Sequence, residues 1–188
     1  MGGDYYTSPI EFLINTLGGL YVAAVMLRFL FQLSRADFYN PISQFIVKIT
    51  NPLLVPLRRV IPSVGGIDTA SLVLLMLLQM AIFAIVLLLR GGIPTPGVLL
   101  IAALIELLQL LINIYFWAIL IQAILSWVQP GQYNPASSLL FQLTSPLLAP
   151  ARRLLPPISG LDLSPLIVIM GLKLAEMILL PPLARLMM

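Results

Sequence analysis

Four long stretches of apolar residues dominate the chain, and shorter polar segments separate them. They run from about residue 9 to 33, 69 to 89, 96 to 127 and 164 to 183. An α-helix of about 20 apolar residues crosses a hydrocarbon core that is about 30 Å thick. The pattern therefore predicts an all-α integral membrane protein with four transmembrane helices. The third stretch is longer than a crossing requires, so its helix must tilt or begin outside the hydrocarbon layer.

The composition excludes most soluble and catalytic classes of protein. Of the 188 residues, 60% are hydrophobic and only 9% are charged, against roughly 25% charged residues in soluble domains. With no Cys and no His, the chain has no disulfides, no thiolate or imidazole chemistry and no Cys/His metal site. We therefore expect no cofactor, no metal and no enzymatic activity. The few basic residues are interrupted by Pro and Leu, which argues against a nucleic-acid partner.

Two polar segments are copies of each other. Residues 39–68 and 133–162 align without a gap at an offset of 94 and are identical at 14 of 30 positions. This predicts two repeats, residues 1–94 and 95–188, each with an interfacial loop between two spanning helices. Because each repeat crosses the membrane an even number of times, the two repeats are parallel. The repeated structural motif comprises Asn40, Pro41, Pro52, Pro56, Pro62, Gly66 and Asp68 in the first copy, and Asn134, Pro135, Pro146, Pro150, Pro156, Gly160 and Asp162 in the second.

Each loop carries signals for two short helices. A polar residue followed by Pro is typical of a helix start, and the first loop has this pair at Asn40-Pro41 and again at Asn51-Pro52. Its three prolines, at positions 52, 56 and 62, argue against one long regular helix. Residues 41–50 are amphipathic and too short to span. We expect them to lie in the membrane interface; packing on the helix bundle is the alternative.

Two pairs of adjacent arginines lie at equivalent places in the loops, Arg58 with Arg59 and Arg152 with Arg153. Guanidinium groups bind phosphate, so these pairs, together with Lys48, are the candidate site for anionic lipid or a partner. The alternative is that the arginines only fix the topology. Six basic residues in the two loops against two on the opposite side place the loops in the cytoplasm and both termini in the periplasm.

Polar residues also occur inside the predicted spans, where they are rare. Three pairs of them recur at the offset of 94 (Asn15 with Gln109, Arg28 with Gln122, Gln79 with Lys173), which predicts that they face the bundle. Lys173 and Glu176 are three residues apart and can form an ion pair. Such groups form either a structural lock or an ion pathway. The intramembrane candidates are Arg28, Gln79, Glu106, Gln122, Lys173 and Glu176.

The doubled motif, which reads YNP, PLLxPxRRxxP and GxD, resembles that of the YggT family of small bacterial membrane proteins. Related single-repeat proteins, called YlmG, occur in Gram-positive bacteria, cyanobacteria and chloroplasts. The resemblance covers almost the whole chain and implies a two-repeat protein of the bacterial cytoplasmic (inner) membrane. It links the chain to osmotic stress and cation homeostasis, to cell division and nucleoid or plastid distribution, and to cytochrome assembly in chloroplasts. The last role transfers least, because the usual axial haem ligands, His and Cys, are missing.

These observations favour a non-enzymatic membrane organiser or assembly factor. Its arginine pairs would bind anionic lipid headgroups or a membrane-protein partner, in envelope or osmotic-stress maintenance or in cell division. A second copy of the chain is a further expected partner. The alternative is a transport component for an ion such as potassium or for an osmolyte, which would act as an oligomer because four helices are few for a pore.

Overall fold

The fold is built from six helices that alternate between long and short. The computed structural model describes residues 3–128, 134–154 and 162–186. The helices are α1 (Gly3–Leu33), α2 (Pro41–Val60), α3 (Thr69–Leu89), α4 (Pro96–Val128), α5 (Pro135–Leu154) and α6 (Ser164–Arg185). Four of them are long and apolar enough to cross a membrane, over Pro9–Leu33, Thr69–Leu89, Pro96–Ser126 and Ser164–Arg185. The predicted all-α architecture with four spanning helices is therefore confirmed.

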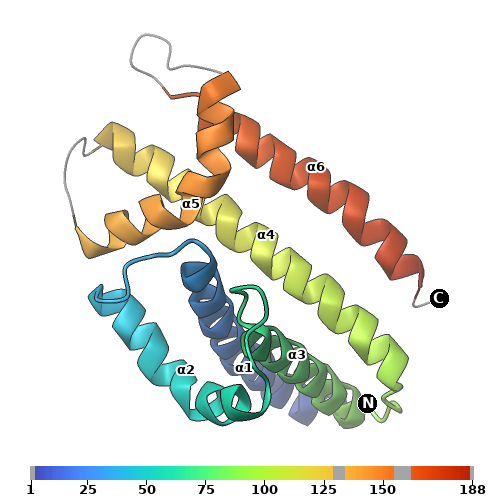
Figure 1. Cartoon of the computed structure of the whole chain (residues 1–188). Coiled ribbons are helices and arrows are strands. Elements are labelled where there is room, and N and C mark those ends of the chain that lie inside the picture. The colour runs from blue at the N-terminus through green and yellow to red at the C-terminus, as the bar shows by residue number, and fades with distance from the viewer. Residues whose placement is uncertain (1–2, 129–133, 155–161, 187–188) are drawn as a thin grey trace.

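The two halves of the chain repeat one arrangement. In the first, α1 packs along α3 and α2 contacts both; in the second, α4 packs along α6 and α5 contacts both. The halves join mainly where α3 packs against α4. Helices α2 and α5 lie at one end of the bundle, which we call the α2–α5 end, and both termini lie at the other (Figure 1). This is the parallel repeat that the sequence predicts.

The core lies where α1, α3 and α4 meet. Val25, Leu30 and Leu75 are fully buried there beside Ala118 of α4, and Leu54 reaches the same core from α2. The outer faces of the spanning helices stay apolar, as at Phe12, whose side chain is exposed. Hydrocarbon solvates such faces, so their exposure costs nothing in a membrane. Helix α6 is the least buried of the four spanning helices.

Each loop contains one helix where the sequence predicted two. Helices α2 and α5 both run for 20 residues, with Pro52 and Pro56 inside the first and Pro146 and Pro150 inside the second. Both ribbons change direction along their length (Figure 1). A proline removes only its own N–H bond, and bending relieves its clash with the carbonyl four residues earlier. The prolines therefore bend these helices without ending them.

The starts of the two loop helices agree with the sequence. Asn40 accepts a hydrogen bond from the backbone N–H of Ile42 at 2.9 Å, and Pro41 opens the helix. In the second repeat, Asn134 accepts from the N–H of Ser137 at 2.7 Å, and Pro135 opens the helix. Both caps satisfy an N–H group that has no partner within its own helix.

Helix α2 has one buried face and also exposes apolar side chains. Ile46, Thr50 and Leu54, spaced four residues apart, are buried against the bundle. Phe45 and Leu53, which directly precede Ile46 and Leu54, are exposed. The helix therefore packs on the bundle, and it also keeps exposed apolar side chains of the kind that an interfacial helix needs.

Candidate functional site

The first arginine of each pair is bound within its own repeat. Arg58 Nη2 lies 2.5 Å from Asp68 Oδ2, and Arg152 Nε lies 2.9 Å from Asp162 Oδ2. These equivalent ion pairs join the end of a loop helix to the start of the following spanning helix. The two arginines are therefore structural braces as well as positive charges.

The aspartates of these braces also cap helices. Asp68 accepts from both the backbone N–H and the hydroxyl of Ser71, in the first turn of α3. Burial by itself raises the pKa of Asp68, but the hydrogen bonds from Arg58 and Ser71 outweigh it and hold the pKa below its usual value. The pKa of Asp162 is lowered in the same way, because hydrogen bonds from Ser164 and Arg152 outweigh its burial. Both carboxylates are therefore ionised near neutral pH.

The second arginine of each pair is exposed. Arg59 and Arg153 lie on the surface at the α2–α5 end and have no hydrogen-bond or ion-pair partner within the described part of the chain. Lys48 is also exposed, on the outer side of α2. The arginine pair thus divides into one bound and one unpaired guanidinium in both repeats.

A buried polar contact joins the first spanning helix of each repeat to its loop helix. Arg28 Nη1 donates to Thr50 Oγ1 at 2.7 Å and to Asn51 Oδ1 at 2.8 Å. At the equivalent place, the hydroxyl of Thr144 donates to Gln122 Oε1. Both polar side chains thus turn toward the protein, as the matched spacing predicts for these two positions.

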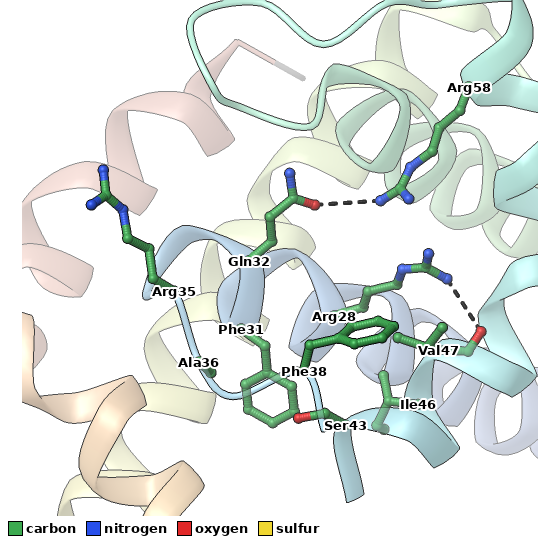
Figure 2. Close-up of a pocket in the computed structure, with 10 residues that line it drawn as sticks. All are labelled: Arg28, Phe31, Gln32, Arg35, Ala36, Phe38, Ser43, Ile46, Val47 and Arg58. Atoms are coloured by element: carbon green, nitrogen blue, oxygen red, sulfur yellow. Dashed lines mark hydrogen bonds between the residues drawn. The ribbon is translucent and has the colours of Figure 1, made fainter. Parts of the chain in front are cut away.

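A cavity of about 550 Å³ lies between the end of α1 and helix α2. Figure 2 shows its lining residues, with Arg28 and Arg58 extending toward the same region and Arg35 standing apart from them. Arg58 Nη2 also donates to Gln32 Oε1 at 3.3 Å. The lining residues are Arg28, Phe31, Gln32, Arg35, Ala36, Phe38, Ser43, Ile46, Val47 and Arg58. Three of them are cationic and none is acidic, so the cavity favours an anion.

A smaller and less basic cavity lies at the corresponding end of α4, among the described residues of the second repeat. This cavity measures about 180 Å³ and contains Gln122, Arg152 and Asp162. Gln122 stands where the first repeat has Arg28, and Asp162 neutralises the single arginine. The two repeats therefore share a scaffold but differ in the charge that they offer to a ligand.

The remaining intramembrane polar residues lie apart from this site. Lys173 pairs with Glu176 at 2.7 Å and lies 5.1 Å from the ring centre of Phe116. Gln79 is buried in α3, whereas Glu106 is exposed on α4. Asn15 is also exposed, which corrects the prediction that it faces the bundle, because in α1 the core-facing side begins nearer the α2–α5 end.

The rest of the repeated motif forms the connection into the next helix. Gly65 and Gly66 have φ values of 62° and 82°, and the flanking Val64 and Ile67 exchange two backbone hydrogen bonds. Two successive positive φ angles favour glycine, as in a tight hairpin turn. The turn follows Pro62 and leads to Asp68, so it carries the carboxylate back to Arg58. Pro156 and Gly160 lie outside the described residues.

The partners of the polar residues were not expected from the sequence. Arg58 and Asp68 are both repeated at the offset of 94, and so is Thr50, which contacts Arg28. That shared repetition was a signal for pairing. The contribution of Arg35 was also missed, although Arg28, Gln32 and Arg35 follow the spacing of one helix face.

Comparison with known proteins identifies the repeat. A family model described as CCB3/YggT matches residues 7–89 and again residues 101–183. An uncharacterised protein of Pseudomonas aeruginosa is 49% identical over 179 residues, which cover 92% of this chain and 89% of that protein. An uncharacterised protein of Vibrio alginolyticus is 44% identical over 174 residues, which cover 92% of this chain and 94% of that protein.

The uncharacterised protein YggT of Escherichia coli K12 is 41% identical over 170 residues, which cover 90% of this chain and 88% of that protein. No solved structure matches the chain significantly. The doubled match and the relatives that align along nearly the whole length show that this chain belongs to the CCB3/YggT family.

Proposed function

We propose that this protein is a non-enzymatic organiser of the bacterial inner membrane that gathers anionic lipid headgroups at the α2–α5 end. The observation that carries the proposal is the division within each arginine pair. Arg58 and Arg152 are bound to aspartates, whereas Arg59 and Arg153 are exposed next to them without a partner among the described residues. The braced arginine fixes the helix end, and the unpaired one is available for a headgroup.

The surroundings of the unpaired arginines support a membrane ligand. Val60 and Leu154, the residues that follow them, are exposed apolar side chains, as are Leu53 and Val55 on α2. A basic group beside exposed apolar residues is typical of helices that lie at the boundary between headgroups and acyl chains. Each such basic group attracts an anionic membrane surface by about 1 kcal/mol.

The charge distribution gives the orientation that we propose. The α2–α5 end carries Arg35, Lys48 and both arginine pairs, whereas Arg90 and Arg185 lie at the other end. The positive-inside tendency therefore favours a cytoplasmic α2–α5 end and periplasmic termini. Headgroup binding would then occur at the inner leaflet, from which the protein could serve envelope maintenance, the response to osmotic stress or cell division.

The arrangement of the intramembrane polar groups supports this role over ion or osmolyte transport. Lys173 and Glu176 neutralise each other at 2.7 Å on the outer helix α6. Gln79 is buried in α3, and Arg28 is bound to α2 near the end of the bundle. Within the described residues these groups lie in separate places and do not line up across the membrane.

The double variant R59Q/R153Q tests the proposal, with R90Q/R185Q as a control that removes the same charge from the opposite end. Each protein is purified from native membranes in a mild detergent, and the retained phosphatidylglycerol and cardiolipin are counted per chain. Cross-linking of the same membranes identifies neighbouring proteins.

We expect R59Q/R153Q to retain fewer anionic lipids than the wild type and to fail to rescue a deletion strain at high osmolarity. The control should retain the wild-type number. Unchanged anionic lipid in R59Q/R153Q, with normal membrane insertion, contradicts the proposal. A loss of cross-linked protein with unchanged lipid shows instead that the arginines bind a protein partner.

A further inference from the structure

We propose that the cavity between α1 and α2 binds the phosphate of one anionic phospholipid, and that an acyl chain of the same lipid lies in an apolar groove between the repeats. The inference deepens the proposed function and rests on it for the presence of anionic lipid at this end. It differs in naming one site, built from α1 and α2, which has no equivalent of the same charge among the described residues of the second repeat.

Arg28 is the central group of this site. Its residue is 8% exposed, and all three of its hydrogen bonds come from Nη1, to Val47, Thr50 and Asn51. A guanidinium has five N–H donors, so the N–H groups of Nε and Nη2 remain without a partner among the described residues. Contacts on one nitrogen hold the side chain in place, while the other nitrogens are free to bind a phosphate in a bidentate manner.

Arg58 adds a second guanidinium to the same region. Arg28 and Arg58 are near enough to interact electrostatically, and Asp68 offsets only one of these two charges. Like charges that lie together in a partly buried cavity repel each other, and a bound anion relieves that repulsion. A phosphate therefore stabilises this arrangement, while a cationic or neutral ligand does not.

An unsatisfied hydroxyl provides an independent sign of a ligand. Ser43 lines the cavity, is 5% exposed, and its Oγ has no hydrogen-bond partner in the described part of the chain. Leaving a buried hydroxyl unpaired is unfavourable. A phosphate oxygen in the cavity would accept the hydrogen bond that Ser43 cannot make within the protein.

Arg35 also lines the cavity, although its side chain stands apart from those of Arg28 and Arg58 (Figure 2), and its backbone has a conformation that usually belongs to glycine. Its φ is 53°, and it ends α1 with backbone bonds from Arg35 to Gln32 and from Ala36 to Phe31. This is the hydrogen-bond pattern of a helix end whose left-handed position favours Gly. A strained arginine at this point is consistent with a side chain retained for binding.

The apolar groove distinguishes a lipid from a free anion. It has a volume of about 360 Å³ and is lined by both repeats, including Leu27, Ile114 and Leu139. Phe31 lines both the groove and the cationic cavity. Because Leu27 and Phe31 occupy the helix face next to that of Arg28, one amphiphilic molecule can place its phosphate in the cavity and its chain in the groove.

The repeat itself predicts how many lipids bind. Gln122 replaces Arg28 in the second repeat, and the cavity there is about 180 Å³ and has one arginine that is paired with Asp162. Among the described residues, that place therefore lacks the net positive charge of the first. One tightly held anionic lipid per chain follows, instead of two.

The experiment measures lipid binding to the delipidated full-length protein in a non-ionic detergent by native mass spectrometry. The probes are phosphatidylglycerol, phosphatidylcholine and inorganic phosphate. For the wild type we expect one phosphatidylglycerol per chain, bound about tenfold more tightly than phosphatidylcholine. Equal binding of the two lipids would overturn the proposal.

Two variants remove the cationic groups by different routes. R28Q installs the residue of the second repeat and should weaken phosphatidylglycerol binding about tenfold, the loss of one charge-assisted bidentate contact. R35G removes a side chain that makes no hydrogen bond or ion pair within the described residues, and it relieves the left-handed backbone at this position. It should therefore weaken binding without lowering the melting temperature. R35G leaves the hydrogen bonds of the other lining residues in place, so a loss of binding in this variant cannot be attributed to unfolding. Wild-type binding in both R28Q and R35G contradicts the site.

A third variant tests whether the acyl chain contributes to binding separately from the phosphate. A136W places a large ring in the groove, which Ala136 lines, and leaves the cationic cavity unaltered. It should weaken phosphatidylglycerol binding severalfold and leave binding of inorganic phosphate unchanged. Unaltered phosphatidylglycerol binding in A136W shows that the cavity takes only a phosphate group, which overturns the lipid assignment.

The R59Q/R153Q variant distinguishes this inference from the proposed function. Neither residue lines the cavity, so this variant should still bind one phosphatidylglycerol tightly even where it retains fewer anionic lipids overall. In one outcome, R59Q/R153Q loses retained anionic lipid while R28Q binds phosphatidylglycerol as the wild type does. That result supports the proposed function and rejects the single site.

Discussion

Arg58 and Asp68 are ten residues apart in the chain and 2.5 Å apart in space, and Arg152 and Asp162 repeat this pairing at 2.9 Å. Each pair closes a loop by joining the end of the bent helix to the start of a spanning helix. The glycine turn before Asp68 gives the chain the reversal that this closure needs. The repeated arginine and aspartate of the motif, and in the first repeat the glycine before the aspartate, thus have a structural role in closing the loop.

The first prediction compares the two braces. D68N should lower the free energy of unfolding by about 1–3 kcal/mol, because it weakens an ion pair and a helix cap together. D162N should cost less than about 1 kcal/mol, since the Asp162 side chain is 29% exposed against 4% for Asp68. Thermal unfolding in detergent measures both. An equal loss in the two variants would contradict the difference in burial.

The second prediction concerns pH. The pKa values of Asp68 and Asp162 are held below the ordinary value of 3.8, since their hydrogen bonds outweigh the effect of burial. A carboxyl group whose pKa is lowered by folding stabilises the protein above the unfolded pKa and loses that contribution as the pH falls through the folded pKa. The melting temperature should therefore be level above about pH 5 and fall below about pH 4. In D68N/D162N the fall should be smaller; a wild-type slope in that variant would rule out these residues as its source.

The third prediction uses the equivalent buried threonines. T50V removes an acceptor of the charged Arg28, and T144V removes the donor to the neutral Gln122. Hydrogen bonds to charged groups contribute about 1.5–3 kcal/mol and neutral ones about 0.5–1.5 kcal/mol. T50V should therefore reduce the free energy of unfolding more than T144V, as measured by denaturant titration in detergent. A larger loss in T144V would show that the hydrogen bonds from Arg28 to Val47 and Asn51 are sufficient without Thr50.

The fourth prediction isolates a contact between the repeats. Asn40 caps α2 through its oxygen, and its Nδ2 donates to the carbonyl of Pro135 in the other repeat at 2.7 Å. N40S keeps a capping oxygen but loses the contact between repeats, whereas N40A loses both. We expect N40S to cost about 0.5–1.5 kcal/mol for the hydrogen bond and N40A about 1 kcal/mol more for the cap. Thermal unfolding compares the two, and a harmless N40S would show that the contact contributes nothing.

Much of the fold follows from local features of the sequence. The apolar stretches specify the four spanning helices, because a backbone in hydrocarbon must satisfy its own hydrogen bonds. Asn40-Pro41 and Asn134-Pro135 specify two helix starts, since a capping oxygen and a residue without an N–H suit that position. The same dipeptide signal failed at Asn51-Pro52, where packing of Thr50 and Leu54 on the bundle keeps the helix continuous.

The candidate site was less predictable from the sequence. The arginine pairs stand out as a repeated motif, but a motif does not tell which guanidinium is bound to a carboxylate and which is free. Arg28 and Ser43 are 15 positions apart and belong to different helices, yet both line one cavity. Pattern and spacing describe each helix separately, whereas a cavity depends on how two helices are placed against each other.

By itself, the sequence determined that the protein is helical, lies in a membrane and is built from two parallel repeats, since hydropathy and internal identity are properties of the chain alone. Only the tertiary structure decided that Arg58 is a brace, that Arg59 is exposed, and that Arg28 faces a basic cavity that Gln122 does not reproduce. The physical reason is that the availability of a charge depends on which groups lie within a few ångströms of it, and packing brings those groups together from distant parts of the chain.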